Sequence, residues 1–402
     1  MTDHFLPPLL LSHFTATSCI GRGLEQTVAA MRAGAGGLVR CAFDTVDLET
    51  FVGEVAGTES IELPAQLKQF DCRNNRIAML GLMQDGFADA VADSAKKYGS
   101  QRVGVFLGTS TSGILQTELA YRRRRLVDGA LPADFVYAST HNCFSVADFA
   151  RQYLELSGPA VVVSSACSSS AKVFASARRM LAAGLIDAAV VGGVDSLCLT
   201  TLYGFNSLGL ISKQACRPFD AARNGISIGE AAAFGLLERL PEQLTGEEIL
   251  LLGVGESSDA HHMSSPHPDG LGARMAMSDA LKMAGLEPPD IDYINLHGTA
   301  TQSNDSAEAK AVASLFGSST LCSSTKGATG HTLGAAGGLE AVICALALQH
   351  GLLPGGLNTR ELDTALPISY LLENRDSAVT RVLSNSFGFG GTNCSLIFGM
   401  SA

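Results

Sequence analysis

The sequence predicts an α/β fold made of two similar halves, and three observations support this prediction. Runs rich in β-branched residues, typical of buried strands, alternate with Ala-rich segments that have helical spacing and almost no proline. Hydrophobic residues make up 46% of the 402 residues and charged residues only 17%, against the roughly 25% that is usual. A charged segment containing a proline, at 238–248, separates two stretches of this kind.

The expected elements follow one another in a regular order. Apolar, β-branched runs predict strands at 102–108, 160–166, 187–194, 291–298 and 381–391. Segments rich in Ala, Leu, Met and Val predict helices at 75–98, 168–185, 273–284 and 339–350. Several of these helices contain so much alanine that we expect them to be buried on all sides.

We place the boundary between the two halves after residue 245. Residues 1–245 and residues 246–402 each contain strands, an Ala-rich helix and a late strand end with glycines. The similarity is one of architecture, because no repeat of the sequence itself is strong enough to count.

Composition and charge exclude several classes of protein. A net charge of −11 argues against a nucleic-acid partner, because phosphate contacts need a dominant positive field. The ten cysteines are scattered, with no CxxC pair and no metal-ligand spacing to a histidine, which is typical of small buried side chains in a reducing cytosol.

Neither the N-terminal segment nor the longest apolar stretch indicates export or a membrane span. Residues 1–14 lack the basic stretch and small-residue cleavage site of a secretory signal. The longest apolar stretch, 341–354, is interrupted and falls short of the about 20 residues that span a bilayer. We therefore expect a cytoplasmic protein without membrane insertion.

Cys167 is the strongest candidate for a reactive group. An apolar strand leads into this cysteine, and a helix follows it directly. At a helix N-terminus, unpaired amides and the positive end of the helix dipole favour a thiolate over a thiol. Its neighbours are serines and alanines, which allow a sharp turn and leave room for a substrate. The alternative is that Cys167 is one more buried cysteine.

Two histidines and a lysine lie at similar turns in the second half. His297 ends a strand before a Gly-Thr turn and a helix, and Lys326 and His331 flank a small-residue loop before an Ala-rich helix. Each of them alone could be structural, as a hydrogen-bonded histidine or a solvated lysine. Together with a helix-capping cysteine they form a far more specific constellation.

Five segments link the chain to a known family. They are SSACSSSA around Cys167, CRPFDAARNGISIGEAAA from residue 216, HGTATQSND from 297, STKGATGHTLGAAGGLE from 324 and SNSFGFGGTN from 384. In this order they resemble the elongating β-ketoacyl-(acyl-carrier-protein) synthases of the thiolase superfamily. The resemblance implies a thiolase-like α/β fold in five layers, α-β-α-β-α, with a Cys-His-His site.

The resemblance also implies a reaction. An acyl group passes from its carrier protein to Cys167, malonyl-carrier loses CO2, and the resulting carbanion attacks the thioester to give a 3-oxoacyl-carrier two carbons longer. His297 and His331 would stabilise the carbanion, and the amides of Cys167 and Phe389 would form the oxyanion hole. Phosphopantetheine arrives on the carrier, so we expect no cofactor and no metal.

Other residues take supporting roles by the same resemblance. Lys326 is expected to organise the site electrostatically, and Glu308 matches the acidic residue that pairs with it. Thr299 and Thr301 match the threonines that hydrogen-bond the pantetheine arm.

A gate over the acyl pocket is also implied. Gly388 belongs to the GFGG turn, and Asp259 belongs to the loop 255–270 that works with this turn. The three histidines of this loop look like a metal tract, but we interpret them as part of a flexible polar loop.

The scarce basic residues suggest where a partner docks. Arg73 and Arg76 begin one predicted helix, and Arg122, Arg123, Arg124 and Arg125 form a run. A solvated face is the simpler interpretation. Acyl-carrier proteins are acidic, however, so a local positive patch on an acidic enzyme would suit this partner. The family also implies a homodimer, or a heterodimer with a related subunit.

Departures from the family pattern leave alternatives open. Gln302 and Asn304 replace the usual proline and glycine, and Ile226 stands where phenylalanine is usual; together these changes hint at a specialised pathway such as polyene synthesis. A non-catalytic chain-length partner would normally lack the cysteine. A thiolase would carry a second reactive cysteine late in the chain, and an initiating synthase asparagine in place of His331. The Cys-His-His set favours the elongating enzyme.

Overall fold

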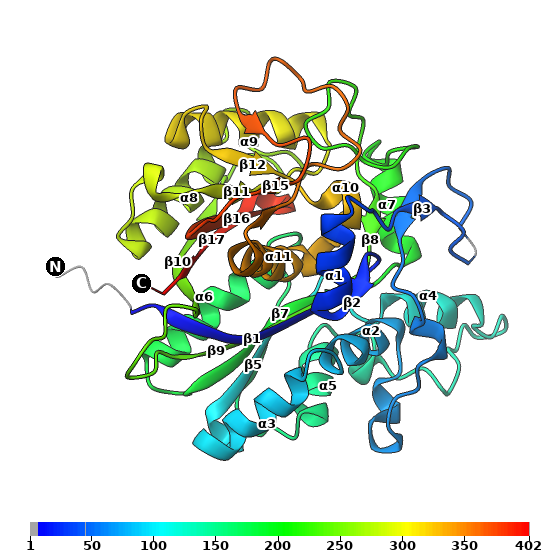
Figure 1. Cartoon of the computed structure of the whole chain (residues 1–402). Helices are drawn as coiled ribbons and strands as arrows, with labels where there is room; N and C mark the ends of the chain where they lie inside the picture. The colour runs from blue at the N-terminus through cyan, green and yellow to red at the C-terminus, as the bar shows by residue number, and fades with distance from the viewer. Residues whose placement is uncertain (1–6, 45, 402) are drawn as a thin grey trace.

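One continuous sheet of twelve strands runs through the structure, a computed structural model that describes residues 7–44 and 46–401 (Figure 1). Residues 1–6, which belong to the N-terminal segment discussed above, lie outside the described residues. The strand order is β14-β12-β11-β16-β17-β10-β1-β9-β7-β5-β6, and the short β2 pairs with β1.

The two halves of this sheet share one topology. The first half contains β1 (Leu9–Ser18), β5 (Val103–Gly108), β6 (Ala160–Val163), β7 (Ala188–Asp195) and β9 (Ala231–Arg239). The second contains β10 (Ile249–Ser258), β11 (Tyr293–Asn295), β12 (Leu321–Ser323), β16 (Arg381–Gly388) and β17 (Thr392–Met400), with β14 (Ser369–Tyr370) at the edge. In both halves the strands, numbered along the chain, lie side by side in the order third, second, fourth, fifth, first.

The half-sheets meet where β1 pairs antiparallel with β10, Leu9 opposite Leu251 and Leu10 opposite Leu250. This pairing makes the two halves one hydrogen-bonded sheet. The exact boundary after residue 245 stays a prediction.

Helices form three layers around the half-sheets. In the middle, α6 (Ser169–Ala182) and α11 (Ala336–His350) each contact strands of both halves. The outer face of the first half-sheet is covered by α2 (Arg73–Leu82), α3 (Phe87–Tyr98) and α5 (Ser145–Tyr153), and that of the second by α8 (Leu271–Ala284) and α9 (Gln302–Phe316). The predicted five-layered α/β fold is confirmed.

The remaining elements are short and connect these layers. They are α1 (Gly23–Arg32), α4 (Ile114–Arg122), α7 (Leu199–Ser207), α10 (Lys326–Thr329), β2 (Gly21–Arg22), β3 (Val39–Arg40), β4 (Phe51–Gly53), β8 (Ile228–Gly229), β13 (Leu352–Leu353) and β15 (Arg375–Asp376).

The two central helices pack closely because small residues face each other. A Cβ added to Gly337 of α11 would lie 2.7 Å from the Cβ of Ala171 on α6, closer than side chains approach. All residues of α11 from Ala336 to Leu348 are buried, as the alanine content predicts. Within the described residues, the segment 333–350 is the one long and apolar enough to cross a membrane, and 89% of it is buried inside the protein. It is a core helix.

One predicted helix proved to be two. The segment 75–98 breaks at Asp85 and Gly86, which adopt left-handed φ values of 55° and 66°. The QDG sequence at 84–86 marks this turn, because Asp and Gly tolerate positive φ better than other residues.

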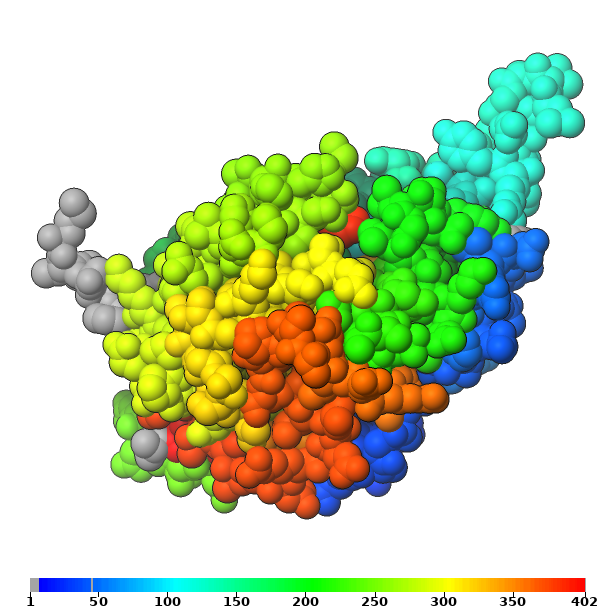
Figure 2. Space-filling view, turned by 90° about the horizontal axis from the view of Figure 1, so that it is seen from above, coloured from blue at the N-terminus to red at the C-terminus, as the bar shows by residue number. Residues whose placement is uncertain are grey.

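A long loop between α4 and α5, residues 123–144, projects from the body of the protein and forms the turquoise extension in Figure 2. The arginine run begins at the last residue of α4 and continues into this loop. The next two residues, Leu126 and Val127, are 92% and 95% exposed.

Candidate active site

Cys167 lies on a tight turn between β6 and α6. The turn needs a left-handed residue, Ala166, with φ 52°, directly before the cysteine. Ser169 closes the turn: its hydroxyl accepts from the Ser165 amide at 2.9 Å and donates to the Ala166 carbonyl at 2.5 Å. Since α6 begins at Ser169 with Ser168 as its N-cap, Cys167 precedes the helix by two residues. It directly follows the strained residue Ala166, and such strain is a frequent property of functional sites.

The structure brings Cys167 together with both predicted histidines. The Cys167 Sγ and the His331 Nε2 are 2.9 Å apart. The rings of His297 and His331 have centroids 5.3 Å apart and are nearly perpendicular, at 84°. One nitrogen of each ring and the sulfur all lie within 4.8 Å of one another, and all three side chains are buried. The cysteine comes from the first half of the sheet and the histidines from the second.

Burial of Cys167 opposes the thiolate that a helix N-terminus is expected to favour. Burial raises the pKa of Cys167 to about 11, although the charge of Lys326 and a hydrogen bond from the Phe389 amide act in the opposite direction. Burial also holds the pKa of His331 well below its usual range, with Lys326 acting in the same direction. The neutral imidazole can therefore accept the thiol proton when the sulfur reacts.

Lys326 determines which nitrogen of His297 carries a proton. The Lys326 Nζ lies 3.4 Å from His297 Nδ1 and forms an ion pair with Glu340. An ammonium group can only donate, so Nδ1 accepts and the proton of the neutral ring resides on Nε2. Burial and the charge of Lys326 hold the pKa of His297 well below its usual range. His297 therefore has a fixed Nε2–H donor.

Glu340, not Glu308, is the carboxylate that pairs with Lys326, so the predicted pairing is wrong. Both members of the ion pair are almost completely buried, at 2% and 3% side-chain exposure. The sequence contained a signal for this role, because Glu340 is the single charged residue in the Ala- and Leu-rich segment 336–349. A carboxylate buried in such a helix needs a cationic partner.

Glu308 instead holds the backbone of the His297 turn. Its two oxygens accept from the amides of His297 and Gly298, each at 2.8 Å, and one of them also accepts from Asn385 Nδ2 at 3.1 Å. Burial raises the pKa of Glu308 to about 7, despite these hydrogen bonds. Glu308 acts on the site through the position of its neighbours.

The turn after β16 approaches the cysteine from the other side. Phe389 lines the same cavity as Cys167, and its backbone amide acts to lower the pKa of the thiol. Gly388 must be small, because a Cβ there would lie 2.9 Å from the Ser165 carbonyl oxygen. The Phe389 ring packs on Phe205, with centroids 5.5 Å apart.

Asp259 ties the loop 255–270 to this turn. Its amide donates to the Gly391 carbonyl at 2.8 Å, and its carboxylate accepts from Asn393 Nδ2 at 2.6 Å and from the His267 amide at 2.7 Å. The rings of His261 and His267 lie 5.1 Å apart. Within the described residues, these histidines do not form a group of three metal ligands.

A narrow cavity with about 50 Å3 of free volume connects these groups. Cys167, His297 and His331 line it together with Thr299, Thr301, Asp259, Gly388 and Phe389. The hydroxyls of Thr299 and Thr301 are 3.0 Å apart, and Thr301 caps the N-terminus of α9. The predicted catalytic and pantetheine-binding residues thus share one cavity, apart from Lys326 and Glu308, which lie behind its wall.

The basic residues predicted to dock a carrier have different fates. Arg73 is only 5% exposed, and its guanidinium is held by Glu230 and Glu59. The prediction is wrong for this residue, because a buried, paired cation is not accessible to a partner. Arg76 is partly exposed and pairs with Asp71. All four residues of the run Arg122, Arg123, Arg124 and Arg125 are exposed.

A two-halved α/β fold that places a buried cysteine beside two neutral histidines, with a backbone amide on the sulfur, defines a thiol-dependent acyl-transferring enzyme. Comparison with known proteins identifies the family. Residues 74–243 match the N-terminal domain of β-ketoacyl synthases and residues 249–360 match their C-terminal domain. The chain belongs to the β-ketoacyl synthase family.

Individual relatives support this assignment. The chain is 31% identical to 3-oxoacyl-[acyl-carrier-protein] synthase 2 of Vibrio cholerae, over 95% of this chain and 96% of that protein. It is 40% identical to the mitochondrial 3-oxoacyl-[acyl-carrier-protein] synthase of Arabidopsis thaliana, over 60% of this chain and 56% of that protein. One chain in the structure of the ketosynthase ApeO in complex with its chain length factor ApeC, from Xenorhabdus doucetiae, matches with a TM-score of 0.87 and 37% identity. The match covers 100% of this chain and 100% of that chain.

These matches confirm the enzyme class predicted from the sequence. The family's reaction is the decarboxylative condensation that elongates fatty-acid or polyketide chains, and the elongating type is the one that the relatives' names support.

Proposed function

We propose that this chain condenses a Cys167-bound acyl group with malonyl-acyl-carrier protein, in the cytoplasm and without a resident cofactor. The observation that supports this most directly is the contact between the Cys167 Sγ and the His331 Nε2, 2.9 Å, in a buried cavity that also contains His297. The roles of the individual residues follow from the geometry around this contact.

The first step transfers the acyl group to the enzyme. His331 takes the Cys167 proton through Nε2 as the sulfur attacks the carbonyl carbon of the incoming thioester. The oxygen gains negative charge and is stabilised by the amides of Phe389 and Cys167. When the intermediate collapses, the carrier thiolate leaves and receives the proton from His331.

The second step generates the carbanion. The malonyl carboxylate leaves as CO2, and its electron pair remains as an enolate on the thioester. The Nε2–H of His297, fixed by Lys326 on the opposite nitrogen, donates to the enolate oxygen. Because the site is buried, this donor stabilises the charge without competition from water.

The third step forms the carbon–carbon bond. The carbanion attacks the acyl carbon, the Cys167 thiolate leaves, and it regains one proton from solvent through His331. The products are 3-oxoacyl-carrier, CO2 and free enzyme. The balance requires neither an oxidant nor a metal ion, which is our reason to propose that no cofactor is needed.

The carrier arm enters along Thr299 and Thr301, and the carrier itself docks on the exposed arginine run. Arg123 and Arg125 pair with Asp134 and Asp128, whereas Arg122 and Arg124 have no acidic partner among the described residues. These two charges are free to attract an acidic protein.

Reversing both charges tests this docking surface. Arg122→Glu with Arg124→Glu is expected to raise the KM for acyl-carrier protein about tenfold or more at low salt, since encounter with an acidic partner depends on these charges. The KM for the same acyl group on a small pantetheine thioester should not change. Lys96→Glu, on the exposed face of α3, is the control. An equal effect on both substrates would contradict docking at the run.

We also propose a dimer, either of two copies or with a related subunit. The edge strand β6 is only half-buried over Ala160–Val163 and ends the sheet, so its free backbone groups can pair with another chain. The complex of ApeO with a chain length factor supports the heterodimeric alternative.

Intact-protein mass spectrometry tests the proposed reaction. The enzyme is incubated with carrier proteins loaded with acyl groups of different length and saturation, and the modified peptide is located by digestion. We expect the mass of one acyl group on Cys167, and its release as a 3-oxoacyl-carrier two carbons longer after malonyl-carrier is added. Acylation at another residue, or no transfer from any substrate to the chain with or without a related subunit, would overturn the proposal.

A further inference from the structure

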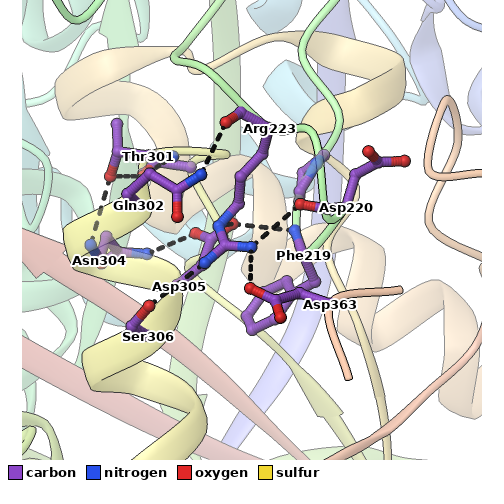
Figure 3. A network of polar contacts seen from close by, with 12 residues as sticks. Phe219, Asp220, Arg223, Thr301, Gln302, Asn304, Asp305, Ser306 and Asp363 are labelled. Atoms are coloured by element: carbon purple, nitrogen blue, oxygen red, sulfur yellow. Dashed lines mark hydrogen bonds and ion pairs between the residues drawn. The ribbon is translucent and has the colours of Figure 1, made fainter. Parts of the chain in front are cut away.

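Asn304 lies in the first turn of α9. The side chain lines the active-site cavity and is partly buried. Figure 3 shows it beside Thr301 and Asp305, at the end of a network that also includes Arg223. The backbone amide of Asn304 donates to the Thr301 hydroxyl at 3.3 Å, which fixes the start of the helix.

The Asn304 carboxamide completes the hydrogen bonds of Glu308. One oxygen of Glu308 accepts from the His297 amide at 2.8 Å and from Asn385 Nδ2 at 3.1 Å. The other accepts from the Gly298 amide at 2.8 Å and from Asn304 Nδ2 at 3.5 Å. Each oxygen therefore has one backbone donor and one carboxamide donor.

The same Nδ2 group also reaches a second buried carboxylate. It donates to the Asp305 Oδ1 at 3.1 Å. Asp305 and Glu308 are 0% and 1% exposed, and like charges this close repel each other in a medium of low dielectric constant. A donor between the two carboxylates offsets that repulsion. Gln302, in the same turn, does not take this role, because its Nε2 donates to the Arg223 carbonyl.

We propose that Asn304 is a positioning residue that holds the Glu308 carboxylate, and through it the backbone of His297 and Gly298, in the geometry needed for carbanion formation. This inference rests on the proposed function of His297. A glycine at this position would leave one Glu308 oxygen with the Gly298 amide as its single donor, at a turn where Gly298 already has a left-handed φ of 38°.

The surroundings of Glu308 determine how the loss would show. Asp305 faces it from α9 and Cys322 from β12, while Arg223 pairs with Asp305 from the adjoining loop at 3.6 Å. Burial raises the pKa of Glu308 to about 7, and every hydrogen bond to the carboxylate lowers this pKa. Removing a donor therefore raises the pKa of Glu308 further. Glu308 then becomes protonated at a higher pH than in the wild type, and its hydrogen bonds to the two amides weaken at that higher pH.

Three variants of Asn304 test the proposal. Asn304→Leu keeps the branched shape without the donor, Asn304→Gly removes the side chain, and Asn304→Asp adds a third carboxylate. We expect the acid limb of the pH profile of condensation to move up by about 0.5 pH unit in the first two and by more in the third. For the leucine and glycine variants, activity at pH 6.5 should fall about threefold and approach the wild-type value near pH 8.5, with normal acylation of Cys167.

Gln302→Ala is the matched control. It removes a carboxamide from the same turn, and this carboxamide contacts the Arg223 carbonyl and not Glu308. Its pH profile should equal that of the wild type. An unchanged acid limb in the leucine and glycine variants, or a loss that is equal at every pH, would overturn the inference. If the wild-type protein itself does not condense, the proposed function fails instead.

Discussion

Replacing Cys167 by alanine is expected to abolish condensation, with a loss of about 1,000-fold or more in turnover. The thiol forms the covalent intermediate. The two histidines in the cavity do not replace it, because His331 transfers the proton and His297 stabilises the enolate. The variant should fold normally, since the side chain is small. The measurement is steady-state formation of 3-oxoacyl-carrier, together with the intact mass of the protein after incubation with acyl-carrier.

Cys143→Ala provides the control. Cys143 is a half-exposed cysteine outside the cavity, so its removal should leave both acylation and turnover unchanged. Turnover above about one-tenth of the wild-type rate in the Cys167 variant would show that the acyl group does not pass through this sulfur.

Breaking the buried Lys326–Glu340 pair is expected to have the second largest effect. Lys326→Met leaves a carboxylate in an apolar layer, and Glu340→Gln leaves an ammonium there. Loss of one partner of such a pair costs about 3–5 kcal/mol of unfolding free energy, because the remaining charge is neither solvated nor paired. Both variants should also lose activity, since Lys326 fixes the proton of His297 on Nε2.

The double variant Lys326→Met/Glu340→Leu separates the two effects. With no charge left in the layer, most of the stability should return, whereas activity should not. Denaturant unfolding measures the first and product formation the second. Lys96→Met, which removes one partner of an exposed pair with Asp93, should change neither. If the double variant regains activity along with stability, Lys326 has no role in orienting His297.

The sequence was sufficient for the class of fold and for the reactive residues Cys167, His297 and His331, because both leave local signals. The strand that runs into Cys167, and the glycine-flanked turns of His297 and His331, can be recognised from neighbouring residues alone. What could not be predicted depends on distant contacts. Glu340 and Glu308 both stand near Lys326 in plausible positions, and the choice between them depends on how α11 lies against α10.

Arg73 shows the same limit. Its position at the start of a helix predicts exposure, but Glu230, 157 residues away, draws it into the core. The arginine run shows no such distant partner, and its exposure follows from the polar sequence around it. The helix N-terminus beside Cys167 is visible in the sequence, whereas the depth of burial, which raises the pKa of the thiol, is not.

The pairing of β1 with β10 has a consequence for how this enzyme loses its activity. Cys167 and the histidines belong to different halves, and α6 and α11 each contact both. Neither half can therefore open while the other keeps a functional site, and separation would expose the apolar faces of two central helices to water. Catalytic activity therefore depends on the whole chain. On heating, we expect activity to be lost before any large loss of secondary structure.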